Sequence, residues 1–309
     1  MRTCPLCGRK GSVMSKWVKG ACEKPLFVCH SNSNGYFKAC ALDRTQAEKA
    51  REDIILRRED VRKLLRMGKP YVLFSGGADS LCLLEYMRRI ASADGKRITA
   101  IHADTTAGFP EVEKYVRRVC KKLKIDLEVV HPQHDFFDIA KRWGIPGPRS
   151  RWCCKTLKVA PIRRFLDTVQ GPKVVFDGIR AAESRMRATY TPVWYHPAFK
   201  CLCASPLFCW SDEKVIDYTQ SHGLPVSPAA RLGTSAECWC GAYQGKSDFE
   251  MLLDLHPEIF DKLLEVEKAQ KGKYTFIYEN GKRIPLGKVR AEVAKRATSP
   301  SSHTLSSPK

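Results

Sequence analysis

The feature that most constrains the fold is the segment 70–80, where an apolar run leads into a glycine loop. Pro70–Phe74 is typical of a buried strand, the sequence Ser-Gly-Gly-Ala-Asp-Ser follows at 75–80, and a helical pattern runs from about Ala78 to Ile90. Two glycines permit a sharp turn that brings backbone N–H groups close to an anion, and the next helix points its positive end there. We therefore expect an α/β fold with a phosphate site. Its candidate ligands are Ser75, Gly76, Gly77, Asp79 and Ser80.

Strand and helix patterns alternate after this loop. Further strands are expected at 98–103, 127–131 and 173–176, separated by helices near 111–123, 136–143 and 156–169. Such alternation predicts an open, mainly parallel sheet with flanking helices. Residues 181–210 are rich in Pro, aromatic residues and Cys, so we expect irregular structure there. Later elements are expected to be a helix at 212–222 with Ser211 as N-cap, helices within 247–268, and a hairpin turning at Asn280-Gly281.

Changes in composition along the chain predict five parts. They are a metal-binding module at 1–45, a linker helix at 46–68, the α/β domain at 69–245, a helical and hairpin extension at 246–297, and a Ser/Pro-rich disordered tail at 298–309. No internal repeat is apparent. No apolar run reaches about 18 residues and the N-terminus has no apolar signal core, so we expect a soluble, cytoplasmic protein.

Charge and cysteine content both bear on binding. Lys and Arg number 53 against 33 acidic residues, and the net charge of +20 favours polyanionic partners such as nucleotides, RNA or DNA. Fourteen cysteines without a secretory signal favour metal sites over disulfides. The early cysteines predict a zinc-ribbon-like site, with Cys22 or His30 as a possible replacement ligand and unpaired core cysteines as the alternative. The expected zinc ligands are Cys4, Cys7, Cys29 and Cys40.

Two segments carry a family resemblance. The 75–80 sequence resembles the PP-loop of the adenine-nucleotide alpha hydrolase superfamily, and residues 153–161 resemble the C-C-x-x-x-K-V-x-P segment of iron–sulfur sulfonucleotide reductases. In that family two adjacent cysteines and a later pair hold one 4Fe-4S cluster, which implies Cys153, Cys154, Cys238 and Cys240 here. The later pair is C-x-C instead of C-x-x-C, so the fourth ligand stays open, with Cys201, Cys203 or Cys209 as substitutes. Zinc and a redox-active dithiol are the alternatives to the cluster.

Other segments extend the resemblance over about 70–242. Residues 178–187 are similar to the family's G-I-R-x-x-[DE]-S-x-x-R segment, and 205–228 to its P-L-x-x-W region. Arginines there match the oxygens of sulfate and phosphate. Lys158 lies one helical turn after Cys154, where its ammonium can link a cluster to a bound anion. Asp104 follows the second strand, next to His102, for which a buried, paired role is as plausible as a ligand contact. The further nucleotide-binding candidates are Asp104, Arg180, Ser184, Arg185 and Arg187.

The resemblance implies an enzyme of sulfur metabolism that reduces phosphoadenosine phosphosulfate (PAPS) or adenylyl sulfate (APS), with Lys158 and Arg180 as catalytic residues and a thioredoxin-type reductant. Its usual mechanism needs a nucleophilic cysteine in a C-terminal segment, and no cysteine follows Cys240 in this sequence. A second hypothesis is therefore an ATP-dependent sulfurtransferase that thiolates tRNA or DNA by base adenylation. A third is a nucleotide-dependent binding protein with a structural cluster.

Overall fold

The computed structural model describes the backbone of residues 2–3, 10–18, 21–29, 38–41, 56–148, 150–184, 187–227, 237–279 and 281–298. Two compact units are present. The first, here called the sheet unit, comprises residues 1–103, 110–130 and 161–235. The second, here called the cysteine unit, comprises residues 104–109, 131–160 and 236–309.

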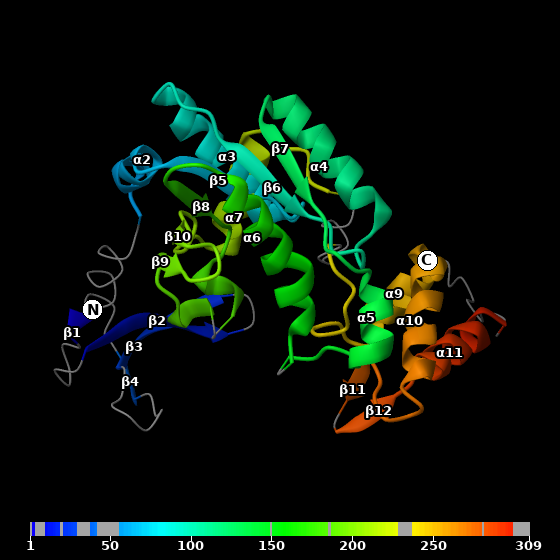
Figure 1. Cartoon of the computed structure of the whole chain (residues 1–309). Coiled ribbons are helices and arrows are strands. Elements are labelled where there is room, and N and C mark those ends of the chain that lie inside the picture. Colours follow the sequence, from blue (N-terminus) through cyan, green and yellow to red (C-terminus); the bar gives the residue numbers. More distant parts are fainter. Residues whose placement is uncertain are drawn as a thin grey trace, which may run out of the picture. The chain divides into compact units, whose positions relative to one another are not determined.

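A six-stranded sheet organises the sheet unit, in the order β7-β6-β5-β8-β10-β9 (Figure 1). The strands are β5 (Lys69–Leu73), β6 (Thr99–Ala103), β7 (Asp126–Val130), β8 (Lys173–Phe176), β9 (Val193–His196) and β10 (Cys201–Ala204). All neighbouring pairs are parallel except β9 with β10. The predicted α/β class with an open, mainly parallel sheet is confirmed.

Helices cover the sheet because its central strands are apolar on both faces. Tyr71 packs edge-on against Phe165 with ring centroids 5.6 Å apart, whereas Phe74, three positions later, lies 6.2 Å from Tyr115. Residues three positions apart in an extended chain point to opposite faces, so α6 and α4 cover different sides. The helices of this unit are α2 (Arg58–Arg66), α3 (Ala78–Ala93), α4 (Pro110–Leu123), α6 (Ala160–Thr168) and α7 (Asp212–Ser221). The expected N-cap is present, since Ser211 Oγ accepts a hydrogen bond from Lys214 N.

The expectation of irregular structure throughout 181–210 was wrong. Apart from the 3-10 turns at Ala181–Glu183 and Arg187–Thr189, this stretch contributes β9 and β10 to the main sheet. Each strand has four residues, too few for a periodic pattern to be visible in the sequence. These two strands form because they pair within the sheet: Leu202 of β10 pairs with Val174 of β8 on one side and with Tyr195 of β9 on the other.

The cysteine unit is mainly helical, with a small hairpin. Its elements are α5 (Phe136–Trp143), the π-helix η1 (Cys154–Val159), α9 (Lys246–Leu255), α10 (Pro257–Ala269), α11 (Leu286–Thr298), β11 (Ile277–Glu279) and β12 (Lys282–Ile284). Trp239, Phe249 and Phe260 are fully buried in its core. Pro257 begins α10, since a first-turn position needs no N–H donor.

The N-terminal residues form a four-stranded antiparallel sheet in the order β1-β2-β3-β4. Its strands are β1 (Arg2–Thr3), β2 (Lys10–Val18), β3 (Ala21–Cys29) and β4 (Lys38–Ala41). The structure does not describe the side chains of this region, and the proposed zinc ligands, Cys22 and His30 are among them. Residues 46–55 of the expected linker helix and 299–309 of the expected disordered tail also lie outside the described residues.

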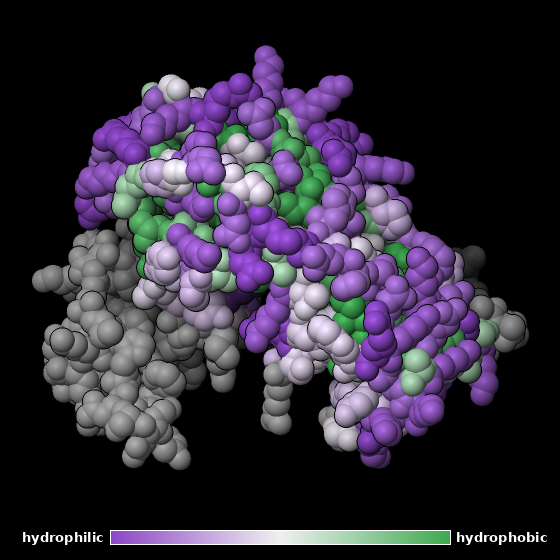
Figure 2. Space-filling model, viewed as in Figure 1, coloured by the Kyte–Doolittle hydropathy of each residue, from purple (hydrophilic) through white to green (hydrophobic). Residues whose placement is uncertain are grey.

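Hydrophilic residues dominate the face seen in Figure 2. Among the helices that the structure describes, none is both long and apolar enough to cross a bilayer.

Candidate nucleotide site and four-cysteine site

Strand order brings two loops of the sheet unit together. From β5 the chain moves to β6 and β7 on one side, whereas β8 pairs with β5 on the other side. Such a reversal leaves a crevice beyond the carboxyl ends of the two strands, where open α/β sheets bind ligands. The glycine loop, residues 75–80, follows β5, and the arginine loop, residues 177–184, follows β8 (Figure 1).

The glycine loop is braced by its own hydroxyl groups. Ser75 Oγ and Ser80 Oγ are 3.0 Å apart, and Ser80 Oγ donates to the carbonyl oxygen of Gly77 at 3.0 Å. Gly76 has a φ of 91°, which glycine adopts without strain. Gly77 is the N-cap of α3, so the first turn of a 16-residue helix follows the turn directly. This arrangement presents backbone N–H groups and the positive end of a helix to an anion.

The two loops are in contact at Gly178. A Cβ placed there would lie 3.3 Å from the backbone C of Asp79 and the backbone N of Ser80. Any side chain at 178 would therefore push the arginine loop away from the start of α3. The glycine of the G-I-R motif is explained by this close approach.

Arg180 joins three segments of the sheet unit. Its Nε and Nη2 donate to the two carboxylate oxygens of Asp79 at 2.9 and 3.3 Å, and Nη2 also donates to Asp212 Oδ1 at 2.7 Å. Nη1 donates to the carbonyl oxygen of Trp210 at 3.2 Å. Only 5% of Arg180 is exposed. Burial raises the pKa of Asp79, and the charge of Arg180 offsets part of that rise. The guanidinium thus holds Asp79, in the first turn of α3, in place.

The remaining residues of the arginine motif interact with one another. Glu183 Oε2 accepts a hydrogen bond from Arg180 N at 2.8 Å, and Glu183 Oε1 pairs with Arg187. Ser184 Oγ accepts a hydrogen bond from Arg187 N at 3.1 Å. The guanidinium of Arg187 is thus directed towards Glu183. Arg185 lies outside the described residues.

His102 and Asp104 have separate surroundings. His102 is buried, and its Nδ1 lies 2.9 Å from the carbonyl oxygen of Phe74, the residue before the glycine loop. The paired, structural role is the one this geometry supports. Asp104 belongs to the cysteine unit, where Oδ1 accepts a hydrogen bond from Thr106 N at 2.8 Å and Oδ2 lies 3.3 Å from His131 Nδ1.

Sequence reasoning missed the roles of Asp212 and Asp177. Asp212 is the second carboxylate on Arg180, and only its place after Trp210-Ser211 in the P-L-x-x-W region offered a signal. Asp177 directly follows β8 and is buried; its carboxylate accepts hydrogen bonds from Ser205 Oγ at 2.5 Å and from Ile179 N at 3.1 Å. Burial raises the pKa of this carboxyl to about 6, although both hydrogen bonds act in the opposite direction.

Asp177 should make the stability of the protein depend on pH. Between about pH 4 and pH 6 the folded state keeps the proton that the unfolded state has lost, so its contribution to stability falls as the pH rises. The free energy of unfolding of the native protein, relative to Asp177→Asn, should fall by on the order of 2 to 3 kcal/mol over this range. Urea titrations at several pH values measure it. Replacement of the exposed Asp217 by Asn is the control. If the free energy of unfolding changed with pH equally in the native protein and in Asp177→Asn, the prediction would be contradicted.

Four cysteine side chains meet inside the cysteine unit. The thiols interact in the order Cys154, Cys153, Cys240, Cys238. Contact with Cys154 and burial raise the pKa of Cys153 to about 12, and contact with Cys153 raises the pKa of Cys240 to about 11. The contact with Cys153, aided by Lys158, lowers the pKa of Cys154 to about 7. Cys153 and Cys240 are buried and Cys154 and Cys238 are partly exposed, and four thiols in contact cannot all ionise unless a positive charge joins them.

Three contacts fix the later pair within this unit. Thr105 Oγ1 donates to the carbonyl oxygen of Glu237 at 2.7 Å, and Trp239 N donates to the carbonyl oxygen of Ala107 at 2.7 Å. The ring of Trp239 stacks on Phe109 with centroids 5.1 Å apart. These bonds hold Cys238 and Cys240 at a defined place although they lie in an irregular segment.

Lys158 is paired inside the same unit. Its Nζ lies 2.9 Å from Glu237 Oε2. Burial lowers the pKa of Lys158, but the negative charges of Glu237 and Cys238 raise it by more, so the ammonium is held charged. Lys158 lies in η1, a π-helix, and single π-turns are frequent at functional sites. The sequence predicted an ordinary helix at this point.

The donor set is one that an iron–sulfur cluster or zinc accepts. Four thiols from an adjacent pair and a C-x-C pair contact one another in one place. The buried Nε1 of Trp239, between the later two cysteines, has no hydrogen-bond partner among the described residues, and cluster sulfides accept such bonds. In the part of the chain that the structure describes, no three His, Cys, Asp or Glu side chains have the arrangement of a metal site. The thiols contact one another in a row. Four cysteine thiolates are the ligand set that a 4Fe-4S cluster takes, so the residue types fit such a cluster.

The substitute cysteines lie in the sheet unit. Cys201 begins β10 and Cys203 pairs in register with Val175; both are buried and in contact with each other. Cys209 is exposed, and it lies between Phe208, whose carbonyl oxygen accepts from Ala181 N at 2.8 Å, and Trp210, which accepts from Arg180. Cys203 lies near Asp177 at the start of the arginine loop but is buried, whereas Cys209 is exposed. No disulfide links the cysteines of the described segments.

Comparison with known proteins identifies the family. The pattern of the "Phosphoadenosine phosphosulfate reductase domain" matches residues 69–235, more than half of the chain. The chain is 30% identical over 171 residues to the phosphoadenosine 5'-phosphosulfate reductase of Xylella fastidiosa, covering 53% of this chain and 68% of that protein. It is 34% identical over 164 residues to an uncharacterized protein of Methanocaldococcus jannaschii, covering 52% of this chain and only 33% of that protein.

Among solved structures, the phosphoadenylyl-sulfate reductase of Candida auris is 19% identical, with 65% of this chain and 97% of that chain covered and a TM-score of 0.47. The family assignment rests on the sequence pattern and on the Xylella relative. This chain belongs to the phosphoadenosine phosphosulfate reductase domain family.

Proposed function

We propose that the protein is a sulfonucleotide reductase-like enzyme that binds PAPS or APS at the glycine loop and carries a 4Fe-4S cluster on Cys153, Cys154, Cys238 and Cys240. The observation that carries the proposal is the meeting of the glycine loop and the arginine loop at the switch point of the sheet, in a chain of this family. A phosphate or sulfate group at that crevice would receive N–H donors from Gly76 to Ser80.

Each residue has a distinct part in this proposal. Ser75 and Ser80 supply hydroxyl donors, and Arg180 neutralises Asp79 so that the loop stays attractive to an anion. Ser184, Arg185 and Arg187 complete the nucleotide contacts, and Asp104 those to the adenosine. When bound, the cluster would supply the positive charge that lets the four thiols ionise together. Lys158, held charged by Glu237, provides an ammonium for the sulfate.

Reduction needs a thiolate that attacks the sulfur of the sulfonucleotide. The S–O bond to the phosphate breaks, the nucleoside phosphate leaves, and a cysteine thiosulfonate forms. One thiol of a thioredoxin-type dithiol then attacks the cysteine sulfur, so that sulfite leaves and a mixed disulfide forms. The second thiol of the reductant attacks that mixed disulfide, which frees the cysteine and leaves the reductant as a disulfide. We assign this step to Cys209, because it is exposed and its neighbours Phe208 and Trp210 are bonded to the arginine loop.

Sulfite release is the test of this function. Anaerobically purified protein given PAPS or APS and a thioredoxin-type reductant should release sulfite, and it should contain iron and acid-labile sulfide. Lys158→Gln should lower kcat/KM by on the order of 100-fold, because one charged donor to the transition state is lost. Lys155→Gln, an exposed neighbour, should stay within about twofold. Cys209→Ser should abolish turnover.

Two results would contradict the proposal. Iron-loaded protein that binds the sulfonucleotide but releases no sulfite would exclude reduction. Finding zinc alone at Cys153 and Cys154 would exclude the cluster.

The net charge of +20 supports a second candidate, ATP-dependent thiolation of tRNA or DNA. The glycine loop would then direct transfer of AMP from ATP to a base oxygen with loss of pyrophosphate, and a sulfur donor would displace AMP. Incubation with ATP, a sulfide source and either nucleic acid separates the candidates. Pyrophosphate release with a thiolated nucleoside, and no sulfite from PAPS or APS, would favour this second reaction.

A further inference from the structure

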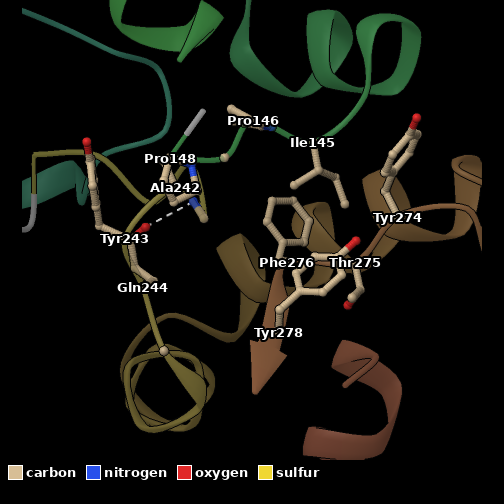
Figure 3. A pocket seen from close by; sticks show the side chains of 13 residues that line it. Ile145, Pro146, Pro148, Ala242, Tyr243, Gln244, Tyr274, Thr275, Phe276 and Tyr278 are labelled. Atoms are coloured by element: carbon tan, nitrogen blue, oxygen red, sulfur yellow. Dashed lines mark hydrogen bonds between the residues drawn. The ribbon is translucent and has the colours of Figure 1, made fainter. Parts of the chain in front are cut away.

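A pocket of about 450 Å³ lies within the cysteine unit, in a part that the proposed reduction does not use. Three segments form it: the loop 145–148, the segment 241–245 that follows the C-x-C pair, and residues 274–278 at the start of the hairpin (Figure 3). Phe276, Ile145 and Tyr278 gather on one side in Figure 3, and Tyr243 stands on the opposite wall. We call it the aromatic pocket.

The aromatic pocket combines a buried floor with exposed rings. Phe276 is only 4% exposed, whereas Tyr243, Tyr274 and Tyr278 are 68%, 53% and 54% exposed. Tyrosines that could pack into a core instead keep their ring faces in water around one hollow. Exposed aromatic surface of this kind, concentrated at a pocket, marks a binding site for a flat ligand.

The hairpin segment that contributes Tyr274 and Tyr278 to the aromatic pocket is basic. The hairpin segment 271–284 carries Lys271, Lys273, Lys282 and Arg283 against a single acid, Glu279. All four cations are exposed; Lys282 pairs in register with Glu279, and Arg283 Nη1 donates to the carbonyl oxygen of Gly272 at 2.6 Å. On the other side of the pocket, Arg151 Nη1 donates to the phenol oxygen of Tyr243 at 3.0 Å. Exposed flat rings next to an exposed basic hairpin are suited to bases joined by phosphates.

The pocket wall continues into the four-cysteine site. Gly241 follows Cys240, its backbone N donates to Gln244 Oε1 at 3.0 Å, and Gln244 Nε2 donates to the carbonyl oxygen of Cys238 at 3.1 Å. A ligand in the pocket would therefore contact residues that fix the later cysteine pair.

We propose that the aromatic pocket receives an unstacked base of a single-stranded nucleic acid, whose phosphates lie along the lysines of the hairpin. A single strand is required because a base inside a duplex presents only its edge, whereas stacking on tyrosine needs a free face. This binding site goes beyond the proposed sulfonucleotide reduction and does not depend on it. Binding of a nucleic acid there would support the second candidate function, thiolation.

Fluorescence anisotropy with labelled 12-residue oligo(U) and oligo(dT) tests the proposal on the full, anaerobically purified chain. We expect dissociation constants of about 1 to 100 µM at physiological salt, with the RNA and DNA probes showing which backbone is preferred. The double variant Tyr274→Ala/Tyr278→Ala should bind at least about 10-fold more weakly, since each base stacked on an aromatic ring contributes a factor of this size. Tyr195→Ala, a tyrosine of β9 that is 59% exposed, is the matched control and should bind as the native protein does.

Salt dependence gives a second, independent readout. In Lys271→Gln/Lys273→Gln/Lys282→Gln the slope of log affinity against log salt should become shallower by about 2, because each phosphate contact to a single strand contributes about 0.7. Circular dichroism and iron content should match those of the native protein, since all the substituted side chains are exposed. No binding to either oligonucleotide, equal binding by the tyrosine double variant, or equal affinity for a 12-base-pair duplex would each overturn the proposal.

Discussion

Replacing Arg180 with methionine should destabilise the protein by about 3 to 5 kcal/mol and abolish nucleotide binding. The guanidinium is 5% exposed and is bound to Asp79 and Asp212, so its removal leaves a carboxylate at the glycine loop without its partner. That uncompensated negative charge would also repel any phosphate or sulfate at the loop. Urea titration measures the first effect, and equilibrium binding of ATP, PAPS and APS measures the second.

A matched pair of variants separates this mechanism from general damage. Arg187→Met removes a cation that is paired with Glu183 but 41% exposed, and it should cost only about 0 to 1 kcal/mol. Adding Asp79→Asn to Arg180→Met should recover part of the lost stability, because the unpaired charge disappears. If Arg180→Met were as stable as Arg187→Met, the buried network would not have the role assigned to it.

Replacing Gly241 with alanine should have the second large effect, in the cysteine unit. Gly241 has a φ of 81°, and a Cβ there would lie 2.3 Å from Cδ1 of the buried Phe276. The backbone strain costs about 1 to 2 kcal/mol, and displacement of a packed phenylalanine adds about 1 to 3 kcal/mol. We expect a loss of about 2 to 4 kcal/mol in the free energy of unfolding and a lower iron content, since Cys240 is the preceding residue.

Gly272→Ala provides the control for the glycine substitution. Gly272 belongs to the same unit and has a φ of 74°, but nothing lies within 4 Å of the position its Cβ would take. The Gly272→Ala variant therefore has the backbone strain without a steric contact. It should lose about 1 to 2 kcal/mol in the free energy of unfolding and keep its iron content. Equal losses for the two variants would show that contact with Phe276 is unimportant.

Local sequence patterns were sufficient for much of the fold. The strand at 69–73, the glycine loop and the helix that follows were predictable because apolar runs, glycine and helical periodicity act on neighbouring residues. The parallel sheet followed from alternation of strands and helices. The strands β9 and β10 were not predictable, since four-residue strands have no clear period and form by pairing with β8.

The candidate site was also predictable from the sequence only in part. The sequence by itself determined which residue types are present: the glycine loop, the arginine motif, and an adjacent and a later pair of cysteines. Only the tertiary structure decided their partners. Arg180 bonds Asp79, 101 positions away, because β5 and β8 are adjacent, and Lys158 pairs with Glu237 because the segment 237–240 is bonded to Thr105 and Ala107. The aromatic pocket also joins three distant segments. A sequence motif reflects local backbone conformation and the chemistry of its own side chains. The residues that those side chains contact depend on chain topology, which no single motif encodes.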